Sequence, residues 1–228
     1  MTPKTRIWVT SDQHFGHDKI IKYAKRPYKN PSVMKDVLIN NWNNLVGIDD
    51  MVICLGDFAW NESSTSLFNL LKRLHGFKVL CKGNHDRLSF SKYLEAGFNF
   101  VCDSFVWHWS GKNILFVHDP NKVAKADYQK YDIIAHGHLH NKDFASNNGR
   151  FVNLSVEKTN YKPVLINSLV NKFYKHNVRA ERKKNERDLE LEYRNGVDED
   201  EEYNSSPSEE DIEIIANSGE QLRSRYSK

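Results

Sequence analysis

The chain has 228 residues, enough for one domain with a sizeable core and an appendage. A hydrophobic fraction of 39% and an aromatic fraction of 12% are ordinary for a globular protein, and no apolar run approaches the ~18 residues that span a bilayer, so we exclude a membrane protein. The net charge of +3 is too small to indicate a polyanionic partner by itself.

The N-terminal segment lacks the apolar stretch and small-residue cleavage site of a secretory signal, which favours a cytoplasmic location. The three cysteines, Cys54, Cys81 and Cys102, show no C-x-x-C spacing, and two of them lie in apolar strand patterns. This pattern predicts buried free thiols rather than a redox or zinc motif.

Two short apolar runs near the N-terminus, residues 6–10 and 51–55, are rich in β-forming residues and predict buried strands. Asp12-Gln13-His14 follows the first run, and Gly56-Asp57 follows the second. Between the runs, apolar residues recur at helical spacing over 37–46, behind start signals at Pro31 and Ser32. We expect that segment to be a helix that packs on the sheet.

A third unit repeats this arrangement. Leucines at 67, 70, 71 and 74 form a helical stripe closed by Gly76, and the strand-like residues 77–81 lead into Gly83-Asn84-His85-Asp86. Strands that alternate with helices predict an α/β fold, in which the polar residues collect at one edge of the sheet.

From about residue 99 the pattern changes to closely spaced strands. Residues 105–109, a turn over 110–113 and residues 114–117 predict a β-hairpin that leads into His118. After a polar segment expected to be helical, Ile133 and Ile134 lead into Gly137-His138-Leu139-His140, and residues 151–156 predict a further strand. The second half therefore supplies a second sheet.

The C-terminal part has a different composition. We expect a catalytic domain over residues 1–170, a basic, charged helical extension over 171–194 and an acidic disordered tail over 195–228, which is too poor in apolar side chains to offset the entropy of ordering. The basic residues of the extension could bind nucleic acid phosphates, but such a run is more typical of a solvated helix face.

Clusters of polar residues follow the predicted strands and carry the chemistry. Carboxylates and imidazoles that converge from several strand ends would repel or desolvate one another unless cations lay between them. The seven candidate ligands are Asp12, His14, Asp57, Asn84, His118, His138 and His140. Seven are too many for one ion, so we predict two ions ~3.5–4 Å apart with a bridging carboxylate such as Asp57. Nitrogen and oxygen donors without a thiolate suit Mn²⁺, Zn²⁺, Fe or Mg²⁺.

The order of these motifs resembles that of the calcineurin-like metallophosphoesterase superfamily, in particular its compact bacterial and phage members, over residues 6–170. The resemblance implies an α/β fold of two mixed β-sheets sandwiched between helices, in four layers. It also implies two divalent ions, with Mn²⁺ preferred. By the same match the first ion is held by Asp12, His14 and His140, the second by Asn84, His118 and His138, with Asp57 as the bridge.

The resemblance further implies a reaction. A metal-bridging hydroxide would attack the phosphorus of a phosphodiester, or less favoured a phosphomonoester, of a small or nucleotide-like molecule, while His85 assists the leaving oxygen. Asp86 would keep the His85 imidazole protonated. His17 and His136 stand beside motif residues and either contact the substrate, support the ligands from behind or are merely solvated. Two alternatives stay open: a metal-dependent nuclease acting on DNA or RNA, and a catalytically silent metal-binding scaffold.

Overall fold

The computed structural model describes residues 5–60, 63–144, 149–171, 173 and 183–188. The chain divides into two units, residues 1–181 and 182–228. All the elements below belong to the first unit, and in the second residues 183–188 are helical. Most of the predicted extension over 171–194 and the whole predicted tail over 195–228 lie outside the described residues. Among the described helices, none combines the length and the apolar character needed to cross a membrane.

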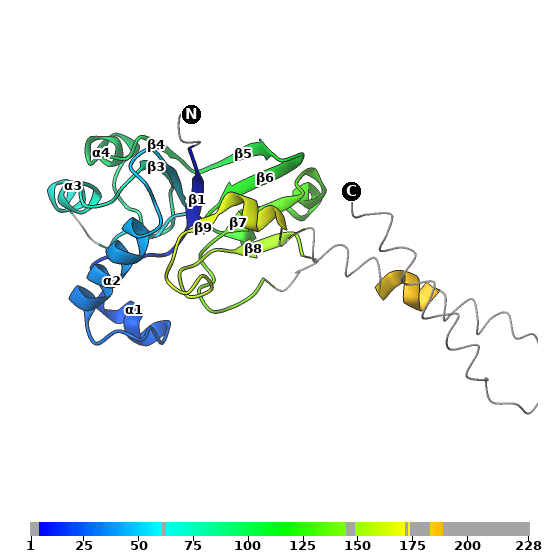
Figure 1. Cartoon of the computed structure of the whole chain (residues 1–228), viewed down its shortest axis with the longest axis horizontal. Helices are drawn as coiled ribbons and strands as arrows, with labels where there is room; N and C mark the ends of the chain where they lie inside the picture. Colours follow the sequence, from blue (N-terminus) through cyan, green and yellow to red (C-terminus); the bar gives the residue numbers. More distant parts are fainter. Residues whose placement is uncertain (1–4, 61–62, 145–148, 172, 174–182, 189–228) are drawn as a thin grey trace, which may run out of the picture. The chain divides into compact units, whose positions relative to one another are not determined.

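The first sheet has five strands in the order β4-β3-β2-β1-β9 (Figure 1). Its parallel part consists of β1 (Ile7–Thr10), β2 (Met51–Cys54), β3 (Phe77–Cys81) and β4 (Phe100–Cys102), and β9 (Val164–Leu165) is antiparallel to β1. Strands buried on both faces read as continuous apolar runs, which is why the sequence predicts the first three of them. Their parallel pairing brings their carboxyl ends to the same edge of the sheet.

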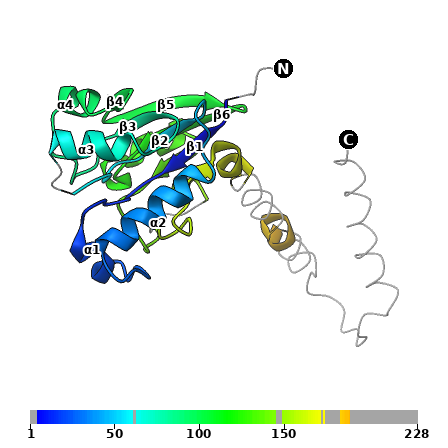
Figure 2. The same cartoon turned by 60° about the vertical axis from the view of Figure 1, so that its left-hand side comes forward.

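Helices connect these parallel strands. The connections contain α1 (Asp18–Tyr23), α2 (Pro31–Asn43), α3 (Ser64–Leu71) and α4 (Phe90–Glu95). The side chains of Asn30, Ser63 and Ser89 accept hydrogen bonds from backbone N–H groups in the first turns of α2, α3 and α4. Figure 2 shows α2 and α3 on one side of the first sheet. The predicted helices over 37–46 and 67–74 are thus confirmed, although both end a few residues earlier.

The second sheet has four strands in the order β5-β6-β7-β8. They are β5 (Ser104–Trp109), β6 (Lys112–Val117), β7 (Ile133–His136) and β8 (Phe151–Asn153), with β5 and β6 antiparallel and the other pairs parallel. The hairpin turn is shorter than the predicted four residues, because Lys112 and Asn113 pair with β5. Ser110 and Gly111 both adopt positive φ, as a two-residue hairpin requires.

The main core lies between the two sheets. Alternate residues of β1, β2 and β3 pack against β6 and β7 in one cluster, which includes Val9, Ile53, Ile114 and Phe116. The opposite side chains of the first sheet pack with α2 and α3 in a second cluster around Trp42. The outer face of the second sheet is covered by the segment predicted to be helical, which forms the 3₁₀ helices η1 (Pro120–Lys122) and η2 (Lys125–Lys130). Two mixed sheets between helical layers confirm the predicted fold class.

Candidate metal centre

The predicted ligands come from five strand ends in the two sheets. Asp12 and His14 follow β1, Asp57 follows β2, Asn84 follows β3, His118 follows β6, and His138 and His140 follow β7. The loops after β1 and β2 are joined by backbone hydrogen bonds, from the N–H of His14 to the carbonyl of Asp57 (2.9 Å) and from that of Phe15 to the carbonyl of Phe58 (3.0 Å). The fold therefore fixes these loops side by side at the edge of the sheet.

The backbone turns sharply at most of these positions. Asp12, His14, Asp57, His138 and His140 all have positive φ, between 47° and 68°. Residues other than glycine adopt this conformation rarely, and such strained residues cluster at functional sites. The turn at 137–140 also explains how His138 and His140, two residues apart, reach different groups of donors.

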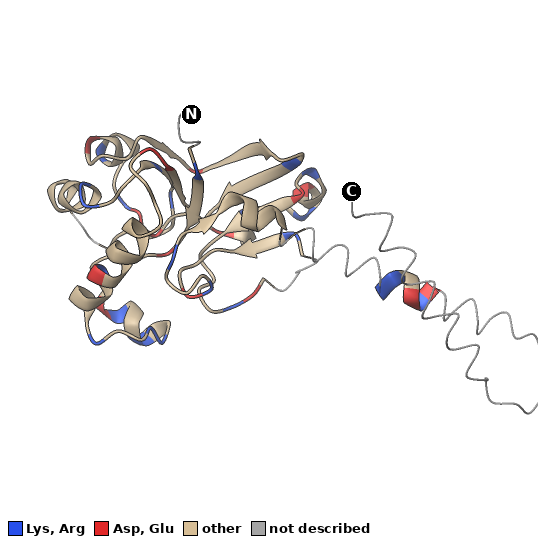
Figure 3. Cartoon of the chain, in the orientation of Figure 1, with Lys and Arg blue, Asp and Glu red and all other residues tan. Residues whose placement is uncertain are grey.

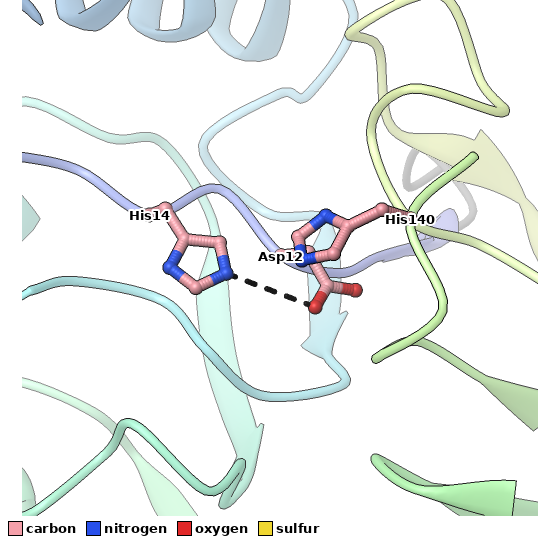
Figure 4. A group of neighbouring side chains, drawn as sticks. All are labelled: Asp12, His14 and His140. Carbon is pink, nitrogen blue, oxygen red and sulfur yellow. Dashed lines mark ion pairs between the residues drawn. The ribbon is translucent and has the colours of Figure 1, made fainter. Parts of the chain in front are cut away.

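One group of donors consists of Asp12, His14 and His140, whose ligand atoms all lie within 4.8 Å of one another. Figure 4 shows the imidazole of His14 and the carboxylate of Asp12 facing each other, with His140 beside the carboxylate. The His14 Nε2 atom is 4.0 Å from Asp12 Oδ1 and 3.5 Å from Asp57 Oδ2. These gaps are too long for hydrogen bonds and leave room for an ion.

A second group of donors lies beside the first and shares Asp12 with it. The ligand atoms of Asp12, Asp57 and His118 lie within 4.8 Å of one another. The His118 Nε2 atom is 3.4 Å from Asp57 Oδ2 and 3.0 Å from Asn84 Oδ1, and Asn84 Oδ1 is 3.0 Å from His138 Nδ1. The structure thus brings all seven predicted ligands together, in two adjacent groups.

The donor set fits divalent cations. Neither ring nitrogen of His14 has a hydrogen-bond partner among the described residues, although the side chain is only 1% exposed. Burial lowers the pKa of His14 to about 2 and so keeps the imidazole neutral, which is the form that binds a metal. Burial also raises the pKa of the Asp12 carboxyl, a cost that a bound cation would offset. A buried nitrogen without a partner needs such an explanation.

Two of the histidines are oriented by acceptors on their other ring nitrogen. The Nδ1 atom of His118 lies 2.7 Å from the Leu55 carbonyl, and Nδ1 of His140 lies 3.1 Å from Glu157 Oε1. Glu157 is itself paired with the buried Arg26, at 2.7 Å. Such partners fix the tautomer and ring orientation of metal-binding histidines.

The sequence interpretation missed Glu157 and Arg26. Glu157 follows the predicted strand 151–156 directly, so the rule that identified the other clusters could have found it. Arg26 carries no local signal, because the acceptor that identifies its role is 131 residues away.

Asp86 holds two of the site loops together. Its buried carboxylate accepts hydrogen bonds from the backbone N–H groups of Asp57 (2.8 Å), Phe58 (3.1 Å) and Gly83 (2.8 Å). Both carboxylate oxygens thus join the loops after β2 and β3, and the expected action of Asp86 on the His85 imidazole stays a prediction. The His85 Nε2 atom lies 3.9 Å from the carboxylate of Asp57.

The two additional histidines lie in different environments. His17 is buried, its ring centroid is 5.3 Å from that of His14, and it stacks on Trp60. His136 packs instead against Phe144 and Phe151, and burial lowers its pKa to about 4. Of the two, only His17 faces the rings of the donor groups.

These features define an α/β protein of two packed sheets with a candidate divalent-metal centre at the carboxyl ends of its strands. Residues 6–157 match the calcineurin-like phosphoesterase superfamily domain. The chain belongs to that superfamily, whose members are hydrolases of phosphoric esters.

Relatives occur in archaea, bacteria and phages. The chain is 32% identical over 169 residues to the uncharacterized protein MJ1445 of Methanocaldococcus jannaschii. The aligned residues make up 72% of this chain and 89% of that protein. It is 36% identical over 86 residues to the gene 66 protein of Mycobacterium phage D29, covering 36% of this chain and 41% of that protein. The crystal structure of AQ665 from Aquifex aeolicus, a protein of unknown function, matches with a TM-score of 0.61 and 25% identity, covering 74% of this chain and 99% of that one.

Proposed function

We propose that the chain is a phosphodiesterase that works with two divalent metal ions. The observation that carries this proposal is the pair of adjacent donor groups that share Asp12, each with ligand atoms within 4.8 Å of one another. One ion would be held by Asp12, His14 and His140, and the other by Asn84, His118 and His138. Asp57 lies 3.5 Å from His14 and 3.4 Å from His118, which supports its role as the bridge.

The chemistry follows from the donor set. Two such ions would supply an activated water as the nucleophile and neutralise charge on the phosphoryl oxygens. Burial raises the pKa of Asp57, but the hydrogen bond and the charge of His118 outweigh it and lower the pKa to about 2, so this carboxylate is ionised at neutral pH. Nitrogen and oxygen donors suit Mn²⁺, our first choice, as well as Zn²⁺, Fe and Mg²⁺.

His85 lies at the edge of the two groups of metal-binding donors. Its side chain is 31% exposed, and its backbone N–H donates a 2.8 Å hydrogen bond to Asp57 Oδ1, which holds it beside the bridge. We assign to His85 the protonation of the leaving oxygen, a contribution of ~10²–10⁴-fold in rate. Its Nδ1 atom is buried and has no hydrogen-bond partner among the described residues.

A cavity beside His118, one of the proposed ligands, supports a diester substrate. It has a volume of about 480 Å³ and is lined by His118, Asp119, Lys122 and Tyr131, among others. A phosphodiester carries a second substituent on phosphorus, and this cavity offers space for it next to His118.

A nuclease would need a basic surface along its substrate. Across the described residues Lys and Arg are spread over several helices and loops rather than gathered on one element (Figure 3), which favours a small ester. The cytoplasmic location stays a prediction.

The test is hydrolysis of bis-p-nitrophenyl phosphate beside p-nitrophenyl phosphate, after the protein has been stripped of metal and refilled with Mn²⁺. We expect metal-dependent turnover of the diester, lost in Asp57→Asn together with metal affinity. His85→Ala should keep metal affinity and lower the turnover of a diester with a poor leaving group by ~10²–10⁴-fold. No turnover of either ester with metal bound would contradict the proposal and favour the silent scaffold.

A further inference from the structure

An indole ring stands beside the proposed general acid. The ring of Trp60 stacks on that of His17, with centroids 3.8 Å apart and planes within 5° of parallel. The Trp60 and His85 rings are 4.7 Å apart and tilted by 51°. The two rings therefore form two walls of one corner, and His85 faces the substrate's leaving oxygen in the proposed reaction.

The backbone holds Trp60 in place. Its N–H donates a 2.9 Å hydrogen bond to the carbonyl of Phe15, and Phe15 pairs with Ala59 in an isolated β-bridge. This is the same ladder that joins the loops after β1 and β2. A preorganised aromatic ring binds a ligand with little loss of side-chain entropy.

The surroundings of Trp60 are those of a ligand site. Trp60 is only partly buried, and the guanidinium of the exposed Arg87 lies over its ring, 6.0 Å from the centroid. His17 behind it is 7% exposed, yet its Nδ1 atom has no hydrogen-bond partner among the described residues. A partly exposed indole beside an exposed cation, backed by a buried imidazole nitrogen without a partner among the described residues, offers a surface on which a planar group can stack.

We propose that Trp60 is the specificity-determining residue for the leaving group, and that it binds a planar aromatic ring carried by that group, either attached directly to the ester oxygen or carried on a sugar as in a nucleoside. This inference rests on the proposed function for the position of the leaving oxygen. Arg87 is exposed, so its guanidinium can move outward and let a flat ring stack on the indole. Such a ring gains stacking and cation–π contacts that an aliphatic group cannot make.

The experiment measures binding of two matched pairs of monoesters to the Mn²⁺-loaded full chain by calorimetry, with released phosphate assayed in parallel. The first pair is AMP and ribose 5-phosphate, and the second is phenyl phosphate and methyl phosphate. In each pair only one member has an aromatic ring, so the ratio of the two Kd values isolates the ring. The pair with the larger ratio shows how far the ring lies from the phosphate.

For the wild type we expect the ligand with a ring to bind about 10-fold tighter in at least one pair, which corresponds to ~1.4 kcal/mol and lies within what the stacking of one base supplies. Trp60→Leu should bring that ratio near 1 and leave the Kd of the ligand without a ring within about twofold. Trp60→Phe keeps a ring and should restore most of the preference. Trp107→Leu on β5, matched in chemistry and away from the donor groups, should leave the ratio unchanged.

Two results would overturn the inference: ratios near 1 for the wild type in both pairs, or a preference that survives in Trp60→Leu. Thermal melting verifies that each variant is folded. Turnover of bis-p-nitrophenyl phosphate separates this failure from failure of the proposed function. A protein that hydrolyses the diester without a ring preference contradicts only the inference. One that prefers rings but hydrolyses nothing keeps the ring site at Trp60, contradicts the proposed function and removes the assignment of that site to a leaving group.

Discussion

Glu157 links the proposed ligand His140 to the buried Arg26. Its Oε1 atom lies 3.1 Å from His140 Nδ1 and 2.9 Å from Arg26 Nε, and the side chains of Glu157 and Arg26 are almost fully buried. Arg26 also donates to the carbonyls of Asp12 and Gln13, at 2.6 and 2.8 Å. One buried ion pair thus orients a proposed ligand and holds the loop that carries another.

Replacing Glu157 with Gln should weaken metal binding by about 10–100-fold, the usual effect of losing the partner of a ligating histidine. The amide keeps the shape of the side chain but removes the charge that pairs with Arg26. Calorimetric titration of the stripped protein with Mn²⁺ measures the effect. Glu95→Gln on the exposed face of α4 is the matched control. Equal affinities for the two variants would show that Glu157 only supports the fold.

Asp50 makes the stability of the fold depend on pH. Burial would raise the pKa of its carboxyl, but hydrogen bonds from Arg6, Gly47 and Trp8 outweigh burial and hold the pKa well below its usual range. The carboxylate joins the start of β1 to the turn before β2, with the Gly47 N–H at 2.7 Å and the Trp8 Nε1 atom at 3.0 Å.

Because the folded-state pKa of Asp50 is depressed, its contribution to stability is complete above the unfolded pKa of ~3.9 and is lost as the pH falls below that value. Asp50→Asn should lower the free energy of unfolding at pH 7 by about 1–3 kcal/mol, since donors are left without a full set of acceptors. It should also flatten the decline of stability below pH ~4. Urea unfolding at several pH values measures both effects.

Asp36→Asn is the control for this prediction. Its carboxylate pairs with Arg73 at 3.3 Å, but both side chains are about half exposed. An exposed pair contributes about 0–1 kcal/mol, so this variant should change little at either pH. A loss as large as that of Asp50→Asn would show that net charge, rather than the buried hydrogen bonds, is responsible.

At the scale of elements, glycines let the strand ends approach one another. Gly137 follows β7 where the second sheet reaches the loop after β1, and a Cβ atom there would collide with the side chains of Ser11 and Asp12. Gly83 after β3 meets Asp57 in the same way. Both glycines are needed because neighbouring atoms occupy the place of a side chain: the Ser11 and Asp12 side chains at Gly137, and the backbone and carboxylate of Asp57 at Gly83.

Gly137→Ala should therefore displace Asp12 and reduce Mn²⁺ affinity by more than 10-fold, with a loss of about 1–3 kcal/mol in the free energy of unfolding. Gly47→Ala is the control, since a Cβ atom at Gly47 would make only ordinary contacts, at 3.4 Å or more. Metal titration and urea unfolding of both variants give the comparison. An unchanged metal affinity in Gly137→Ala would show that Ser11 and Asp12 can yield without loss of the site.

The elements also show what the sequence could and could not predict. Apolar runs followed by Asp and His predict the strands and the residues at their ends, because burial and metal binding leave strong local patterns. The positive φ of Asp12 and His138 and the pairing of Arg26 with Glu157 depend on contacts between distant segments. The hydrogen bonds that Asp86 accepts could not be predicted for the same reason, since two of the donors lie in the loop after β2.

At the scale of the whole molecule, the C-terminal part lies beyond the superfamily match. The match ends at residue 157, and the structure of AQ665 covers 74% of this chain while 99% of its own length is matched. A protein with the same fold therefore exists without a counterpart of about a quarter of this chain. The proposed ligands and Glu157 all lie within the matched region.

Removing residues 195–228 should therefore leave Mn²⁺ affinity, diester turnover and melting temperature unchanged, because the superfamily match and all the proposed ligands end before them. The same assays on a deletion of residues 151–228, which removes β8 and Glu157, should show loss of folding and of metal binding.

The acidic charge of the tail allows a second measurement with the shorter deletion. A tail that shields the basic residues of the extension over 171–194 would weaken the binding of nucleic acid. If the shorter deletion strengthens binding of a labelled single-stranded oligonucleotide, with an effect that disappears at high salt, the tail regulates a basic surface and the nuclease alternative gains support. If binding stays the same, the matched domain alone carries the chemistry.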